Sequence, residues 1–232
     1  MLIIVDHKIS GEAKGKLSTH GDLMELKTEG ITYPAISGHP DIFFCQAPGK
    51  LIVAPNLPGL YFDQLRDHNV DYITGELPVG PEYPASARYN AVATDKYLIH
   101  NFRHTDFMIT RTLEDLHPIN VDQGYCRCNL LPLKDDHFIT SDQGFFKVLK
   151  QRNLDVLIVS PEGIKLAGFP HGFFGGGCGV WDDKVFINGS LKFYKEGEKV
   201  RDFLKELDYE ILELMQGPLV DIGSIFFIKK SV

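Results

Sequence analysis

The stretch Cys178–Ser190, CGVWDDKVFINGS, holds two short apolar runs on either side of an Asp-Asp pair. Apolar runs joined by acidic turn residues predict a β-hairpin. The pattern of a small or polar residue, an apolar run, a turn and a second apolar run occurs four more times. The other copies are DIFFCQAPGKLIVAPN from Asp41, NAVATDKYLIHNF from Asn90, NLLPLKDDHFITSD from Asn129 and SIFFIKKSV from Ser224. The chain therefore contains an internal repeat with a period of roughly 40 to 50 residues.

A helix-like segment and another apolar run follow the hairpins. After the third hairpin, residues 141–153 (SDQGFFKVLKQRN) have the spacing of an amphipathic helix, and residues 154–160 (LDVLIVS) have the composition of a strand. The fifth hairpin ends the sequence, and residues 1–30 carry a strand, a helix and a strand. We therefore predict one domain, residues 1–232, whose last unit combines residues 221–232 with residues 1–30.

A strand-strand-helix-strand unit cannot bury its own apolar face. Five such units around a pseudo-fivefold axis would share one core, and closing the ring would protect the sheet edges. The repeat thus predicts an α/β fold in which five units form a closed propeller. The alternative is a three-layer α/β domain in which the similarity between the segments is accidental.

Composition excludes several classes of protein. A chain of 232 residues with 44% hydrophobic content can bury a full core, and its net charge of −7, without a basic block, argues against nucleic acid as a partner. No apolar window approaches the roughly 18 residues of a membrane span. Four irregularly spaced cysteines do not form a disulfide scaffold, and Cys126-Arg127-Cys128 has the wrong spacing for zinc. We expect a cytoplasmic protein without a metal or cofactor, with Cys126 and Cys128 facing the core from one strand.

Two segments resemble a known family. HPDIFFCQ (39–46) is similar to the family's first-unit pattern of Pro-Asp before an apolar strand, and LVDIGSIFFI (219–228) is similar to its glycine-rich approach to the nucleophile. These segments and the five units resemble the pentein fold, or guanidino-group-modifying enzyme superfamily, over essentially the whole chain. The resemblance implies a five-bladed α/β propeller.

The resemblance also implies roles for the repeated residues. Asp41 falls where the family has a substrate-binding acid. Asn90 falls near the place of another acid, Asn129 in the place of a proton-transferring histidine, and Ser224 in the place of the nucleophilic cysteine. A serine is a poor nucleophile without an adjacent base, and asparagine cannot carry protons near pH 7. The chain is thus similar to a divergent member that lacks the usual C-terminal Cys and third-unit His.

The repeat predicts where a site lies. If the first residue of each copy opens an inner strand, five side chains gather around a central cavity: Asp41, Asn90, Asn129, Cys178 and Ser224. Asp221, three residues before Ser224, either lines the same cavity or caps a turn.

Cys178 is the candidate nucleophile in that cavity. Gly176 and Gly177 leave its approach open and offer backbone N–H groups to a developing oxyanion. His171 and His39 are the nearest candidate proton carriers. Each residue has a plainer interpretation, since a lone cysteine is commonly a small core hydrophobe and a loop histidine commonly bonds a carbonyl.

Two functions follow from this arrangement. In the first, Cys178 attacks a small guanidino or amidine compound, a histidine moves the proton, and Asp41 orients the cationic nitrogen. The chain would then be a Cys-dependent hydrolase of a C–N bond. In the second, the chain keeps the ring and the polar cavity but only binds a small molecule or a protein.

Overall fold

The computed structural model describes residues 1–231, which form five separate three-stranded sheets. The first four sheets follow one another along the chain. They are β3 (Phe44–Ala47), β4 (Lys50–Val53) and β5 (Ile73–Thr74); β6 (Val92–Ala93), β7 (Tyr97–His100) and β8 (His117–Asn120); β9 (Leu130–Pro132), β10 (His137–Thr140) and β11 (Asp155–Ile158); β12 (Cys178–Trp181), β13 (Lys184–Ile187) and β14 (Glu210–Glu213). In each sheet the first strand is antiparallel to the second, and the second is parallel to the third.

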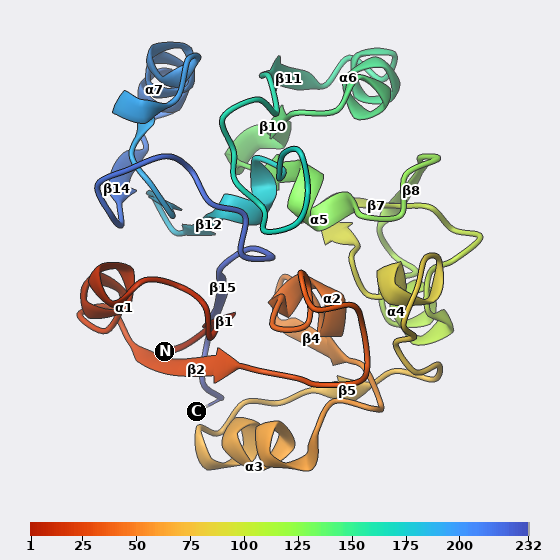
Figure 1. The fold of residues 1–232 in the computed structure, drawn as a ribbon. Helices are drawn as coiled ribbons and strands as arrows, with labels where there is room; N and C mark the ends of the chain where they lie inside the picture. The colour runs from red at the N-terminus through yellow and green to blue at the C-terminus, as the bar shows by residue number, and fades with distance from the viewer. Residues whose placement is uncertain (232) are drawn as a thin grey trace.

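The fifth sheet joins the two ends of the chain. Strand β1 (Leu2–Asp6) lies between β15 (Phe226–Ile228) and β2 (Asp22–Leu26). It is antiparallel to β15, with Leu2 opposite Ile228, and parallel to β2. Figure 1 shows the N-terminus and the C-terminus close together beside this sheet.

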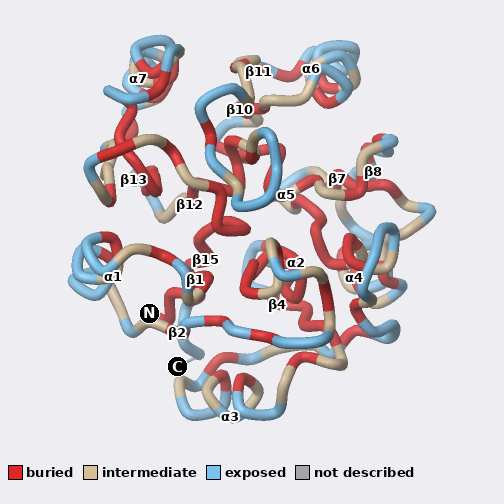
Figure 2. Tube along the Cα trace, viewed as in Figure 1, coloured by how far each residue is buried: buried red, intermediate tan, exposed pale blue. Residues whose placement is uncertain are grey.

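One helix connects the second and third strand of every unit. These helices are α1 (Gly11–Leu17), α3 (Gly59–Asp67), α4 (Phe107–Thr112), α6 (Gln143–Lys150) and α7 (Gly197–Glu206). In α6 the side chain of Asp142 accepts hydrogen bonds from the first backbone N–H groups, and Phe145 and Leu149 turn inward because they lie one helical turn apart. The helices lie around the outside of the molecule (Figure 1), and their buried residues face the sheets (Figure 2).

The five units surround a common centre, to which each contributes its first strand (Figure 1). This confirms the predicted five units of strand, strand, helix and strand. The predicted closure of the ring is not confirmed, because the strands of residues 1–231 form five separate sheets that are not joined to one another by strand pairing. Isolated contacts join neighbouring units, such as the hydrogen bond from Gln46 Nε2 to the Phe227 carbonyl at 2.7 Å.

The repeated residues do not all open strands as predicted. Cys178 begins β12, but Asp41 lies in the short helix α2 (Pro40–Phe43) and Asn129 ends the short helix α5 (Cys126–Asn129). Cys126 and Cys128 are buried as expected, although they lie in a helical turn and not in a strand. Within residues 1–231, no helix is both long enough and apolar enough to cross a membrane.

Candidate functional site

The five repeated residues, which we call the hub, are sealed from solvent. Their exposed fractions are 0% for Asn90, Asn129 and Ser224, and 1% for Asp41 and Cys178. Three of them are bonded together. Ser224 Oγ donates to Asp41 Oδ2 at 3.1 Å, and Asn90 Nδ2 donates to the Asp41 carbonyl at 3.0 Å. The structure therefore brings together Asp41, Asn90 and Ser224 from three different units.

The carboxyl group of Asp41 is only partly satisfied. One oxygen accepts the Ser224 hydroxyl, and the other, Oδ1, has no hydrogen-bond partner although it is buried. Burial first, and the nearby Asp221 second, raise the pKa of Asp41 to about 7. The Asp41 carboxyl group therefore takes up a proton more readily than an exposed aspartate.

The other two hub residues point elsewhere. Asn129 Nδ2 donates to the Tyr125 carbonyl at 2.9 Å. The Cys178 side chain packs in an apolar cluster with Phe174 and Ile187, and burial raises the pKa of its thiol to about 12. The thiolate of Cys178 is therefore disfavoured at neutral pH.

His39 and Asp221 lie beside the hub in a cluster that also contains Asp6. The His39 ring lies 3.8 Å from Asp6 Oδ2 and 4.0 Å from Asp221 Oδ1, beyond hydrogen-bond distance. Burial lowers the pKa of His39 to about 3 and raises the pKa of Asp221 to about 6. The His39 imidazole is thus neutral. Asp221 accepts backbone N–H groups from Phe173 at 2.9 Å and Gly223 at 3.0 Å.

No imidazole is hydrogen-bonded to the Cys178 thiol in the part of the chain that the structure describes. His171 Nδ1 lies 3.1 Å from the Gly172 carbonyl, and its ring packs edge-on against Phe173. His39 faces the two acids of its own cluster. His171 therefore has the plainer role of bonding a loop carbonyl, whereas the His39 ring lies between two buried acids without a hydrogen bond.

The glycine run before Cys178 serves close packing. A Cβ at Gly176 would lie 2.1 Å from Asp221 Oδ1, and a Cβ at Gly179 would lie 2.5 Å from the Ile225 carbonyl oxygen. The Gly176 carbonyl accepts N–H groups from Ile222 and Ser224 at 3.0 and 2.8 Å. A Cβ at Gly177 would lie 3.1 Å from the Val220 carbonyl oxygen, a looser contact. These contacts hold the fourth unit against the fifth, and they explain the glycines without substrate access to the thiol.

A cavity opens at the other end of the inner strands. Its volume is about 510 Å³, which suits a small molecule. All five inner strands line it, through Gln46 of β3, Ala93 of β6, Pro132 of β9, Val180 of β12 and Phe227 of β15. The cavity thus lies on the central axis that the repeat predicts, but the hub residues do not line it.

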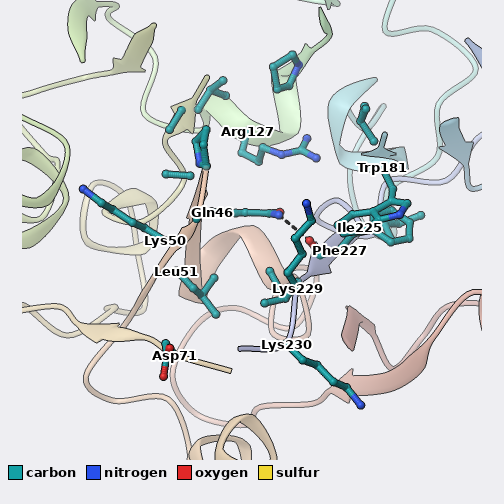
Figure 3. Close-up of a pocket in the computed structure, with 18 of the residues that line it drawn as sticks. Gln46, Lys50, Leu51, Asp71, Arg127, Trp181, Ile225, Phe227, Lys229 and Lys230 are labelled. Carbon is teal, nitrogen blue, oxygen red and sulfur yellow. Dashed lines mark hydrogen bonds between the residues drawn. The ribbon is translucent and has the colours of Figure 1, made fainter. Parts of the chain in front are cut away.

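Arg127 of α5 lines the cavity (Figure 3). Its guanidinium donates to the carbonyl groups of Gly175 at 3.3 Å and Cys178 at 3.5 Å, and it lies 5.5 Å from the ring centre of Phe226. The repeat did not point to Arg127, Asp6 or the cavity-lining Trp181. The available signal for Arg127 was its place as a single cation between two buried cysteines.

The profile of the Family of unknown function (DUF6873) matches residues 4–226. The chain belongs to this family. No curated protein matches its sequence. Within residues 1–231, no group of three or more His, Cys, Asp or Glu is arranged to hold a metal ion.

This chain shares its fold with solved enzymes, as three structures show. SxtG, an amidinotransferase of the saxitoxin biosynthetic pathway from Microseira wollei, is 13% identical with a TM-score of 0.59, covering 100% of this chain and 94% of its own. A dimethylarginine dimethylaminohydrolase adduct with S-methyl-L-thiocitrulline is 11% identical with a TM-score of 0.58, covering 91% of both chains. The agmatine deiminase of C. jejuni is 11% identical with a TM-score of 0.52, covering 92% of this chain and 75% of its own. The predicted pentein fold is confirmed, and identities this low show the fold alone.

Proposed function

We propose that this chain is a pentein-fold binding protein that holds a small molecule in its central cavity without chemical turnover. The observation that carries the proposal is the sealed hub. Asp41, Asn90 and Ser224 form hydrogen bonds with one another and with backbone atoms, and although Asp41 Oδ1 has no partner, the exposed fractions of all three residues are only 0–1%. A substrate needs contact with the reacting groups, and these groups face the protein.

The surroundings of Cys178 support the same conclusion. A cysteine nucleophile acts as its thiolate, usually beside a histidine or another cation. Here burial raises the pKa of Cys178 to about 12, and the nearby Arg127 only partly opposes that rise. The hypothesis of a Cys178-dependent hydrolase acting on a cationic guanidino compound stays a prediction, motivated by the fold.

The cavity is the natural place for a ligand. It meets the inner strand of every unit, so its walls are fixed by the whole ring, and a preformed site costs little conformational entropy on binding. Trp181 lines this cavity and is the only tryptophan of the chain. Its fluorescence therefore reports directly on occupancy of the cavity.

The test is a fluorescence titration of the full chain. The panel contains phenyl and aliphatic compounds in anionic, neutral and cationic forms, together with arginine, dimethylarginine and agmatine. We expect saturable changes in Trp181 fluorescence that Ala93→Phe abolishes by filling the cavity and that Ala93→Ser preserves.

The same compounds are assayed for release of ammonia, urea or citrulline. Binding without product supports the proposal. Product that Cys178→Ala abolishes would establish the hydrolase instead, and a panel without any saturable change would exclude the cavity as a site for these compounds.

A further inference from the structure

We infer that the central cavity selects small organic acids, with the carboxylate held by Arg127 and Lys229 and the apolar part packed against the cavity wall beside Trp181. This inference rests on the proposed function, that the cavity binds a small molecule, and it names the chemical class of that molecule. It differs from the sequence-based expectation of a cationic guanidino ligand on Asp41.

Arg127 supplies a cation at the inner end of the cavity, and the nearby Asp41 interacts with it electrostatically without forming an ion pair within 4.0 Å. Its two hydrogen bonds go to neutral carbonyl groups and are long, at 3.3 and 3.5 Å, and no carboxylate of the described residues forms an ion pair with it. A guanidinium has five N–H donors in a planar fork that matches a carboxylate. An oxyanion would fill the unused donors and offset the cost of a partly buried charge.

Lys229 supplies a second cation on the same side. Lys229 directly follows β15, and Figure 3 shows its side chain extending toward Gln46 and the region of Arg127. Its ammonium lies 5.4 Å from the ring centre of Trp181, and it forms no ion pair within residues 1–231. An anion between the two cations would contact both and lie next to the indole.

The other charged side chains that line the cavity already have polar partners. Lys230 pairs with Asp22 at 2.8 Å, and Lys50 donates to the Thr112 carbonyl at 2.7 Å; in Figure 3 both point away from the centre. The single lining carboxylate, Asp71, accepts the Ser231 hydroxyl at 2.6 Å. The protein has a net charge of −7, yet this cavity is positive, and a cavity with one sign of charge attracts the opposite sign.

The walls define the rest of the ligand. Side chains without polar atoms cover much of the lining, and those that the inner strands contribute next to the cations are Val92, Ala93, Val180, Ile225 and Phe227. A bare inorganic anion would leave this surface wet, whereas a phenyl or alkyl group would bury it. A guanidinium ligand would meet repulsion from both cations.

The experiment compares matched ligands by Trp181 fluorescence. Phenylacetate and hexanoate are titrated beside their uncharged amides and beside phenethylamine. We expect the carboxylates to bind at least about tenfold more tightly than the amides, the amine not to bind, and added NaCl to weaken the carboxylates alone.

Three variants locate the contacts. Arg127→Gln should lower carboxylate affinity at least about tenfold, and Lys229→Gln should lower it less because its ammonium lies at the exposed rim. Lys230→Gln, a rim lysine already paired with Asp22, is the matched control and should change affinity less than about threefold. If Arg127→Gln fails to fold, the affinity of Lys229→Gln and the salt dependence of binding to the wild-type chain decide whether the carboxylate is held by the two cations.

The two proposals fail in different ways. Amides that bind as tightly as acids, or carboxylate binding that ignores Arg127→Gln, Lys229→Gln and salt, would overturn the inference and leave the proposed function standing. A panel in which no compound binds would overturn both.

Discussion

Replacing the buried Asp41 with asparagine should stabilise the protein at alkaline pH and not at acidic pH. The folded-state pKa of Asp41 is raised from 3.8 to about 7, chiefly by burial. The folded protein therefore holds this proton more tightly than the unfolded chain. Stability from this group is complete below pH 3.8 and is lost as the pH rises through 7. The amide introduced by Asp41→Asn cannot ionise and keeps an oxygen for the Ser224 hydroxyl.

The magnitude follows from the pKa. At about 1.4 kcal/mol per pH unit, ionising Asp41 lowers the free energy of unfolding by roughly 3 kcal/mol between pH 5 and pH 8. The wild-type profile alone cannot isolate this change, because the pKa of Asp221 is raised to about 6 and Asp221 therefore adds a loss of the same sign. The pKa values of His39 and His100 are lowered to about 3 and about 4, so these buried histidines destabilise the folded state as the pH falls below 6.5. Their contribution opposes that of Asp41 over the acidic range.

The assay therefore measures a difference between two proteins. Urea unfolding of the wild type and Asp41→Asn at pH 5 and pH 8 gives the change in free energy of unfolding at each pH. We expect the advantage of the variant to grow by about 3 kcal/mol from pH 5 to pH 8. Asp202→Asn, at an exposed acid, should show no such growth. An equal difference between wild type and Asp41→Asn at both pH values would refute the argument that Asp41 is held protonated by burial.

Three further predictions follow from the packing. Gly176→Ala should lower the free energy of unfolding by about 1–3 kcal/mol, because its Cβ would lie 2.1 Å from Asp221 Oδ1. The control Gly15→Ala, in open space on helix α1, should raise the free energy of unfolding by about 0.5–1 kcal/mol. Equal effects of the two substitutions in urea unfolding would contradict the close-packing role of Gly176. Cys178 should react with iodoacetamide at pH 7.5 only after denaturation, because the residue is 1% exposed and the pKa of its thiol is raised to about 12. Peptide mass spectrometry measures the labelling. Rapid labelling of the native protein would instead support a reactive thiolate. Asp106→Ala should lower the free energy of unfolding by about 3 kcal/mol or more, because Asp106 accepts hydrogen bonds from three backbone N–H groups and from the Tyr89 hydroxyl. The control Ser10→Ala, which removes a helix cap, should lower it by about 1 kcal/mol. Similar melting temperatures for the two variants would show that the hydrogen bonds of Asp106 are unimportant.

The repeat carried most of the information about the fold. Apolar runs separated by turn residues predicted the first four hairpins, because the pairing of their strands depends on residues close in sequence. The fifth hairpin, predicted from Ser224, does not form within the described residues, because β15 pairs with β1 instead. Asp142 before the apolar spacing of α6 is a helix start that sequence reveals directly. The placement of Asp41 beside Ser224 was also within reach, since the repeat aligned them before any coordinates.

The orientation of the Arg127 side chain could not be predicted from the sequence. Read as a strand, Cys126-Arg127-Cys128 turns the arginine away from the two buried cysteines. The segment is instead a short helix, which carries the guanidinium toward the carbonyl groups of Gly175 and Cys178 and toward the cavity. One turn of backbone thus decides whether Arg127 is a surface residue or part of the centre.

The close packing of the glycine run could not be predicted from the sequence for a related reason. Glycine permits both an open approach and tight contact, and only the neighbour decides which. Here the neighbour of Gly176 is Asp221, more than forty residues later in the chain and invisible to any local pattern.

The pairing of β1 with β15 imposes an order on biosynthesis. The first strand emerges from the ribosome with β2 as its only early partner, and its second edge waits until residues 226–228 have been made. For most of translation the nascent chain therefore carries an unmatched apolar strand, open to chaperones and to neighbouring nascent chains. Assembly of the ring is thereby postponed until residues 226–228 are available to pair with β1.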